Sequence, residues 1–212
     1  QPSWSSDGRA ITFVTWAARE GGQVWTLSAR GRGAPKQLTK ESAYYTEPVF
    51  SPDGKSVLAL RASHYDRLRA RSEIDPSRAT DIIRLPASGG DAQLVAHAHG
   101  ARFLDFGSEP NLIRFFTPEG VKTLRIDEPS SEPRRVVVVL ARHPSQYVEG
   151  PAPVEEVRLN PDGTWALAKA ASQLYLVAVP PTIGNDPPVV NLQSPSTKVV
   201  KLTAVGADYL GW

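Results

Sequence analysis

The chain has 212 residues, of which 41% are hydrophobic and 22% are charged, values within the ordinary range of globular domains. Lys and Arg outnumber Asp and Glu by 24 to 22, a balance that argues against a dedicated nucleic-acid binder. The sequence has no cysteine, which excludes disulfides, thiolate metal sites and a cysteine nucleophile, and it has no apolar run of membrane-spanning length.

Four segments of the sequence resemble one another. In chain order they are PSWSSDGRAITFV from Pro2, EPVFSPDGKSVLAL from Glu47, FGSEPNLIRFF from Phe106 and VRLNPDGTWALA from Val157. Their apolar anchor residues are Trp4, Phe50, Phe106 and Leu159, and a fifth copy opens at Trp212 in ADYLGW. The anchors recur about every 50 residues, a period in the range of β-propeller blades.

Each unit continues with an apolar strand, a turn rich in Gly, Pro or Ser, and another strand, as in GGQVWTLSARGRGAPKQLT and TDIIRLPASGGDAQLV. Apolar and polar residues alternate at 11–14 and 24–27, as in half-buried strands. The sequence therefore predicts an all-β fold, a β-propeller segment over 1–212. The expected blades are 1–46, 47–100, 101–150 and 151–205, with the next starting near 208.

The first hairpin of each unit is predicted to turn at a Ser-Pro-Asp-Gly type of sequence. Ser51-Pro52-Asp53-Gly54 suits a type I turn position by position, and residues 160–163 (NPDG) and 5–8 (SSDG) repeat its chemistry. Residues 107–110 have lost Asp-Gly, so we expect a looser loop there. An aspartate that recurs once per unit is a turn residue rather than a catalytic acid, which would normally be unique.

The segment VAHAHGARF holds the strongest candidates for a metal site. His97 and His99 lie two apart, so on a strand they would share a face and could begin a zinc site. The only other histidines are His64 and His143, and no carboxylate or lysine context accompanies the pair. We therefore interpret it as a partly exposed strand end and expect no metal, cofactor or catalytic residue in this chain.

The stretch from Arg61 to Arg78 is rich in arginine and separates two strands of the second unit. A loop of this length is usually functional or mobile, and it offers a docking place for a phosphate or an anionic partner. The alternative, which we favour, is a solvated short helix with Arg69 and Glu73 paired at i,i+4.

Other candidate motifs are weaker. ARGRGAPK lacks the spacing of a nucleotide-binding loop, and the sequence contains no Gly-x-Ser-x-Gly elbow and no plausible Ser-His-Asp set. Core packing is expected for most of the aromatic residues at strand positions, which are Trp4, Trp25, Phe50, Phe103, Phe106, Phe115 and Trp165.

The repeats resemble the WD40-like propeller repeat of TolB, of tricorn-type and prolyl-oligopeptidase-type peptidases, and of many bacterial amidohydrolases. The residues that carry this resemblance are PSWSSDGRAITF with QVWTL and KQLT, and EPVFSPDGKSVLAL with DIIRLPASGG. Within this class, LRASHYDRLRARSE and NPDGTWALAKAASQLYLVAVP look most like the propeller that precedes the metal-dependent barrel of large bacterial amidohydrolases.

The resemblance implies a non-catalytic propeller region that packs on or gates a hydrolase barrel outside this chain, where a divalent metal would lie. Two alternatives stay open: a TolB-like module that binds other envelope proteins, and the gating propeller of a serine peptidase. The partners implied are further blades and a catalytic domain of the same parent, in a periplasmic or otherwise extracytoplasmic bacterial location, without nucleic acid or a membrane span.

The parents of this class have six or seven blades, so the resemblance also implies a larger ring. The chain lacks methionine and starts at Gln1 without a signal-peptide pattern, and we expect a processed or excised piece of a longer protein. An incomplete ring would expose strand edges and apolar blade faces. We therefore expect residues 1–212 alone not to be autonomous.

Overall fold

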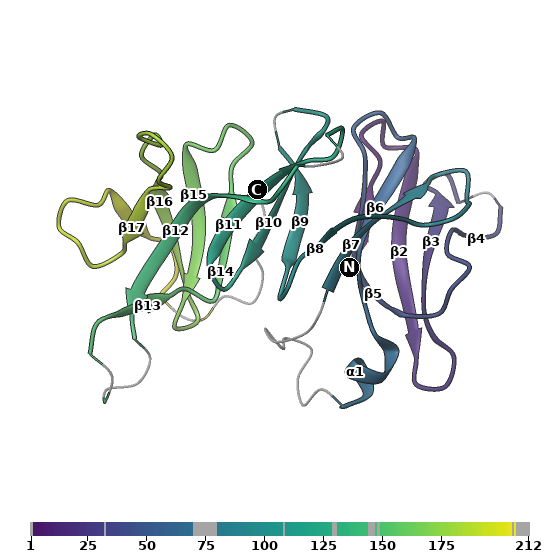
Figure 1. Ribbon diagram of the computed structural model, residues 1–212, viewed down its shortest axis with the longest axis horizontal. Coiled ribbons are helices and arrows are strands. Elements are labelled where there is room, and N and C mark those ends of the chain that lie inside the picture. Colours follow the sequence, from purple (N-terminus) through teal and green to yellow (C-terminus); the bar gives the residue numbers. More distant parts are fainter. Residues whose placement is uncertain are drawn as a thin grey trace. The chain divides into compact units, whose positions relative to one another are not determined.

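The computed structural model describes residues 2–31, 33–69, 80–107, 109–128, 131–143, 147, 149–204 and 206. These residues form strands, turns and one short helix, α1 (His64–Arg69) (Figure 1). Within this part of the chain, no helix has the length and apolar character that crossing a membrane requires.

The first two sheets are antiparallel four-stranded meanders in which the strands pair in chain order. Blade 1 contains β1 (Ser3–Trp4), β2 (Ala10–Ala17), β3 (Gly21–Ser28) and β4 (Lys36–Gln37). Blade 2 contains β5 (Tyr44–Phe50), β6 (Ser56–Ala62), β7 (Thr80–Pro86) and β8 (Gln93–His97). Helix α1 lies in the connection between β6 and β7.

The third sheet is larger than the predicted unit of four strands. Blade 3 contains β9 (Arg102–Phe106), β10 (Leu112–Thr117), β11 (Gly120–Arg125) and β12 (Arg134–Arg142), and β12 also pairs with β13 (Pro151–Pro153). Blade 4 contains β14 (Glu156–Leu159), β15 (Trp165–Ala170), β16 (Gln173–Ala178) and β18 (Val199–Lys201). The remaining strand, β17 (Val189–Asn191), comes between β16 and β18 but pairs with β12 of blade 3.

The four predicted anchor residues that the structure describes occupy equivalent places. Trp4, Phe50, Phe106 and Leu159 are the last residues of β1, β5, β9 and β14, the first strand of each blade. The fifth anchor, Trp212, lies outside the described residues. The predicted all-β fold of four blade repeats is therefore confirmed.

The first hairpin of every blade is closed by the same backbone hydrogen bond. The N–H of residue i binds the carbonyl of residue i+5 at 2.8 Å for Ser5 and Gly107 and at 2.9 Å for Ser51 and Asn160. The loop at Gly107 therefore has the same length as the others, although its turn is closed differently, by Leu112 N–H to the Glu109 carbonyl. The expectation of a looser third loop stays a prediction, because residue 108 lies outside the described residues.

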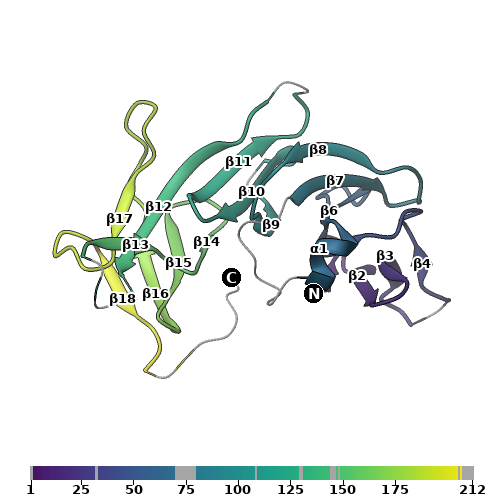
Figure 2. The same cartoon turned by 60° about the horizontal axis from the view of Figure 1, so that its bottom comes forward.

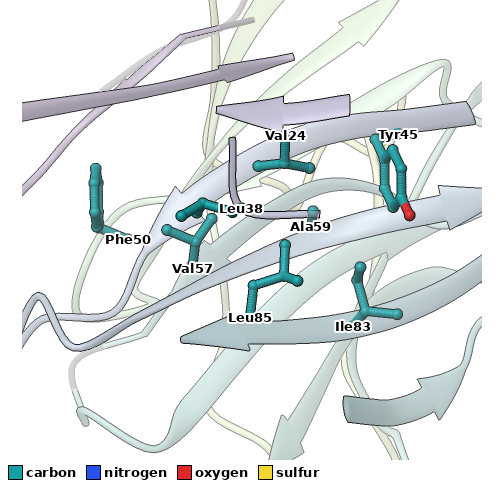
Figure 3. Packing of buried hydrophobic residues seen from close by; sticks show 8 residues of the cluster. All are labelled: Val24, Leu38, Tyr45, Phe50, Val57, Ala59, Ile83 and Leu85. Carbon is teal, nitrogen blue, oxygen red and sulfur yellow. The ribbon is translucent and has the colours of Figure 1, made fainter. Parts of the chain in front are cut away.

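The chain divides into two compact units, Gln1–Ile113 and Arg114–Trp212. In the first unit, apolar side chains of blades 1 and 2 form one core (Figure 3), whose members are Val24, Leu38, Tyr45, Phe50, Val57, Ala59, Ile83 and Leu85. Strand β6 is buried along nearly its whole length, so it lacks the alternation that a sheet with one wet face would show. The predicted limits of the blades and the single propeller segment over 1–212 stay predictions.

The aromatic residues expected in the core divide into three groups. Phe50 and Phe115 are buried, whereas Trp25, Phe103, Phe106 and Trp165 are half-buried. Trp4 is 60% exposed and is the exception to the prediction. The indole N–H of Trp25 donates to the Thr15 hydroxyl at 2.9 Å, which lets this ring keep a polar edge near the surface.

We expect Gly54→Val to lower the free energy of unfolding by at least ~1 kcal/mol, because Gly54 has φ +69° and an L residue is strained in that region. A Cβ at this position would meet no atom within 4 Å, so the cost comes from the backbone and not from a clash. Gly54→Asn is the matched control, since Asn tolerates left-handed backbone better than a β-branched residue does. Urea unfolding midpoints measure both, and equal midpoints for wild type and Gly54→Val would contradict the turn assignment.

Candidate functional site

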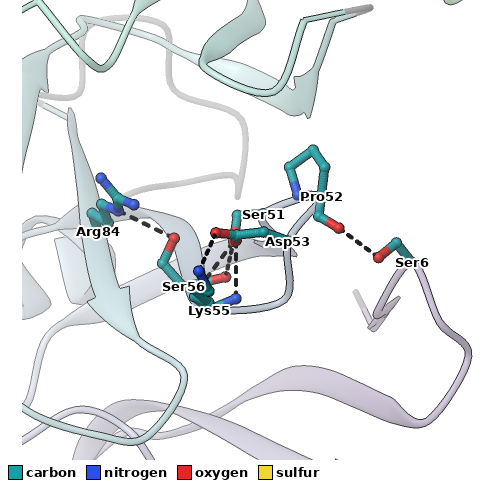
Figure 4. Close-up of polar contacts among 7 residues, drawn as sticks. All are labelled: Ser6, Ser51, Pro52, Asp53, Lys55, Ser56 and Arg84. Carbon is teal, nitrogen blue, oxygen red and sulfur yellow. Dashed lines mark hydrogen bonds and ion pairs between the residues drawn. The ribbon is translucent and has the colours of Figure 1, made fainter.

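The repeated aspartates lie in the hairpin turns, and Figure 4 shows the one in blade 2, Asp53. The hydroxyl of Ser51 lies 2.6 Å from Asp53 Oδ1 and accepts the N–H of Ser56 at 3.0 Å, while the N–H of Lys55 donates to Asp53 Oδ1 at 3.0 Å. Gly54 N–H closes the turn on the Ser51 carbonyl at 2.8 Å. The Ser51 hydroxyl and Asp53 Oδ1 therefore both support the turn.

The same network recurs in blades 1 and 4. In blade 1, the Ser5 hydroxyl lies 2.7 Å from Asp7 Oδ1 and accepts the N–H of Ala10 at 2.9 Å. In blade 4, the amide oxygen of Asn160 replaces the serine hydroxyl and accepts the N–H of Trp165 at 2.9 Å, while Asp162 accepts the Thr164 N–H at 2.9 Å. The interpretation of these aspartates as turn residues agrees with all three sites.

Hydrogen bonds lower the pKa of all three turn aspartates. The hydroxyl of Ser5 is the main cause for Asp7, that of Ser51 for Asp53 and that of Thr164 for Asp162, and a backbone N–H adds to each. These donors favour the charged carboxylate, which is an acceptor only. A carboxyl group that is kept ionised in this way is a poor general acid near neutral pH.

The other polar constellation is a row of charged side chains across blade 2. Arg61, Asp81 and His97 are direct register partners on β6, β7 and β8. Arg61 Nη2 donates to Asp81 Oδ2 at 2.9 Å, and His97 Nδ1 lies 2.7 Å from Asp81 Oδ1. Arg61 Nη1 also lies 3.6 Å from Glu41 Oε2. We call Glu41, Arg61, Asp81 and His97 the charged row.

Asp81 is the centre of the charged row. Burial acts to raise its pKa, but hydrogen bonds from Arg61 and then His97 outweigh burial, so the pKa of Asp81 is lowered. His97 is 78% exposed in its side chain, whereas Arg61 and Asp81 are about one-quarter exposed. The row therefore presents a surface histidine whose ring is oriented by a fixed carboxylate.

The charged row lies at one end of blade 2. Arg61 is next to the last residue of β6, Asp81 is next to the first residue of β7, and His97 ends β8. The Ser51–Gly54 turn precedes β6, so it lies at the other end of the same blade. Helix α1 begins two residues after β6 ends, which brings its first residues to the end that carries the row.

The structure places the two candidate metal-binding histidines differently from each other. His97 is the last residue of β8, whereas His99 lies in a turn beyond the strand, after the bond from Ala98 N–H to the Thr80 carbonyl. The pair therefore lies at an exposed strand end, as interpreted from the sequence, and the shared strand that a zinc site would need is not formed. Within the described residues, no group of three His, Asp or Glu side chains is arranged to hold a metal ion.

Part of the arginine-rich stretch falls outside the described residues. A short helix is present at α1, as the favoured interpretation predicts. Residues 70–79, including Arg71 and Glu73, are outside the described part, so the predicted Arg69–Glu73 pair stays a prediction. At the start of α1, His64 Nε2 lies 3.1 Å from the Ala18 carbonyl and the His64 ring packs near that of Trp16, with centroids 6.0 Å apart. These contacts attach the helix to the β2–β3 hairpin of blade 1.

One residue that sequence reasoning missed is Glu47. It has φ +52° at an irregularity in the β5–β6 pairing, and its Oε2 accepts the N–H of Leu104 in β9 at 2.7 Å. Phe103, also three residues before its anchor, has φ +58°. The signal in the sequence is an acidic residue three positions before the anchor, which recurs as Glu156. Glu47 therefore joins the first strands of two successive blades.

No protein-family model matches the chain. Part of it is 37% identical over 67 residues to the Tol-Pal system protein TolB of Francisella tularensis, a match that covers 31% of this chain and 15% of that protein. Another match, 35% identical over 57 residues, is to the uncharacterized peptidase YuxL of Bacillus subtilis and covers 27% of this chain and 8% of the peptidase. The chain thus spans a small fraction of these relatives.

Solved structures resemble the whole architecture at low identity. TolB from Acinetobacter baumannii superposes with TM-score 0.57 at 14% identity, over 97% of this chain and 43% of that one. The putative TolB from Agrobacterium tumefaciens gives 0.55 at 16% identity, over 84% and 56%. A prolyl endopeptidase structure gives 0.53 at 12% identity, over 93% and 28%. The chain therefore has a TolB-like β-propeller fold, as the repeats predict.

The lowered pKa values of the turn aspartates predict a loss of stability in acid. An unfolded aspartate titrates near pH 3.9, so the contribution of each turn carboxylate is complete above that pH and is lost as the pH falls through the folded pKa. The melting temperature of wild type should therefore exceed that of Asp53→Asn near pH 7, and the difference should shrink as the pH falls below the unfolded value of about 3.9. Ser51→Ala should weaken this pH dependence, because it removes the main cause of the lowered pKa. A constant difference across this range would contradict the role of Asp53.

We expect the purified protein to contain no stoichiometric zinc. His99 lies outside β8, and Asp81, the carboxylate beside His97, is already hydrogen-bonded to Arg61. Elemental analysis after dialysis against zinc measures this directly. One zinc per chain that disappears in the His97→Ala, His99→Ala double variant would overturn the expectation.

Proposed function

We propose that residues 1–212 act as a non-catalytic propeller segment that docks another domain or protein. The observation that carries this proposal is the use of the recurring turn aspartates, Asp7, Asp53 and Asp162, as turn supports. The charged row offers a docking surface, since its hydrogen-bonded side chains are already ordered before a partner arrives.

The parent that the sequence resemblance favours is an amidohydrolase-type protein, with a metal-dependent barrel outside this chain and further blades that complete a six- or seven-bladed ring. This proposal is supported by the resemblance of LRASHYDRLRARSE and NPDGTWALAKAASQLYLVAVP to such propellers. A divalent metal would belong to the barrel, where it would activate water for hydrolysis. We also propose a periplasmic or otherwise extracytoplasmic place, which the resemblance to TolB-type propellers supports.

Two other parents have specific support. The match to TolB supports a propeller that binds proteins of the cell envelope. The matches to YuxL and to a prolyl endopeptidase structure support a propeller that gates a serine peptidase. The coding sequence on either side of residues 1–212 distinguishes the three parents. A His-x-His barrel supports the first, an upstream α/β domain without an enzyme supports the second, and a Gly-x-Ser-x-Gly elbow supports the third.

The docking proposal predicts that the charged row contributes to binding of the neighbouring domain. That domain, expressed separately, should bind residues 1–212 in isothermal titration calorimetry, and His97→Ala should weaken binding roughly tenfold, as for a residue that contributes strongly to an interface. His97 is the suitable position because its exposed ring can be removed without leaving a cavity.

Lys55→Ala is the matched control, since Lys55 is an exposed charged residue of the same blade that follows the turn at its other end. It should bind like wild type. Equal binding by His97→Ala and wild type would remove the charged row from the interface, and no binding by wild type would contradict the docking function itself.

A further inference from the structure

The connection between the third and fourth strands of blade 4 contains a strand that serves another blade. Residues 179–198 separate β16 from β18, whereas residues 87–92 are enough for the same connection in blade 2. Within this insertion, β17 pairs in parallel with β12, the outer strand of blade 3 (Figures 1 and 2). Both strands belong to the second compact unit.

The pairing uses the outer edge of β12. Val138 N–H donates to the Pro188 carbonyl at 3.0 Å, and Leu192 N–H donates to the Leu140 carbonyl at 2.8 Å. The carbonyl of Val139, which points to the opposite edge, accepts Val154 N–H at 3.2 Å. Backbone groups of successive strand residues point to opposite edges, so β17 and β13 pair with opposite edges of β12.

A single apolar pair accompanies these bonds. Val139 and Val190 are register partners, and both are almost fully buried. Val189 is exposed, and Asn191 is half-buried opposite Leu140. The edge of β12 therefore binds an extended segment through two backbone hydrogen bonds and one buried side chain, as strand-addition sites do.

The ladder that joins β17 to β12 is short. The ladder has three residue pairs in parallel arrangement, which is slightly less stable per residue than an antiparallel one. Pro187 and Pro188 precede it and have no N–H to donate, so the ladder cannot extend in that direction by further donors. Short, peripheral segments of this kind open at low free-energy cost compared with the core.

We propose that the outer edge of β12 is a strand-acceptor site for an extended segment of a partner protein. Strand β17 occupies this site in the free chain, and the partner segment displaces it. The partner segment would run parallel to β12, with a valine or isoleucine at the place of Val190. It would offer a carbonyl at the place of Pro188 and an N–H at the place of Leu192. The inference rests on the proposed function only in taking the chain to be a protein-binding module.

The probe for this proposal is a fluorescein-labelled peptide of residues 186–194, DPPVVNLQS. Its binding is measured by fluorescence anisotropy to the full chain and to a full-length variant in which residues 187–193 are replaced by a Gly/Ser linker of equal length. The variant should bind the peptide. Wild type should bind it at least roughly tenfold more weakly, because its own β17 competes at a high effective concentration.

Two controls keep the result interpretable. A peptide with Val190→Asp should bind the variant at least roughly tenfold more weakly, since a carboxylate cannot occupy the buried place opposite Val139. Leu192→Pro in the otherwise intact chain removes the N–H that binds the Leu140 carbonyl, and it should raise peptide binding above wild type if the linker variant does not fold. Circular dichroism identifies the variants that retain the fold.

A folded linker variant and a folded Leu192→Pro chain that both fail to bind the peptide would overturn the proposal, as would equal binding by wild type. If wild type dimerises and the linker replacement abolishes the dimer, the edge binds β17 of a second copy, and this result would also overturn the proposal. None of these readings depends on the neighbouring domain. A failure here is therefore distinguishable from a failure of the docking function.

Discussion

The backbone hydrogen bond between residues i and i+5 of each first hairpin is the constraint on which the blades depend. It fixes the loop length at Ser5, Ser51, Gly107 and Asn160 alike, although the side chains in the loops differ. The anchor residue immediately before each loop is thereby held at the end of the first strand, and the second strand starts in a defined register. In blades 1, 2 and 4, a side-chain oxygen of residue i, from serine or asparagine, accepts the N–H of residue i+5, so a second bond runs in the opposite direction.

This use of the aspartates decides how the rest of the polar surface is interpreted. A carboxylate that accepts bonds from its own loop is satisfied and ionised, and it has little capacity left for a substrate. The charged row differs, because its three strand positions come from sequence-distant parts of one blade and end in an exposed imidazole. Ordered charges on a rigid sheet favour selective association more than raw affinity, which suits a docking surface better than a reaction site.

The sequence predicted what local chemistry determines. The first four anchors, the three Asp-Gly turns and the third strands of the blades follow from apolar alternation and turn chemistry, and they lie where expected. The charged row was not predicted, because the pairing of Arg61 with Asp81 depends on how β6 and β7 align across a long connection. For the same reason His97 and His99 looked equivalent in the sequence, although the ladder ends between them. The spacing of Glu47 from the anchor is visible in the sequence, but its hydrogen bond is not, because its partner Leu104 lies in the next blade.

The four outer strands explain why β17 serves blade 3 rather than another blade. An open edge with a long apolar run invites pairing with other chains, and proteins protect such edges by shortening, charging or covering them. Strands β4 and β18 are only two and three residues long, and β8 ends in the exposed His97. Strand β12 has nine residues, and its arginines lie only at its ends, so neither shortness nor charge protects the central run from Val136 to Leu140. A covering strand solves this problem, and because it covers only three residues, the protection is compatible with exchange for a better-matched segment.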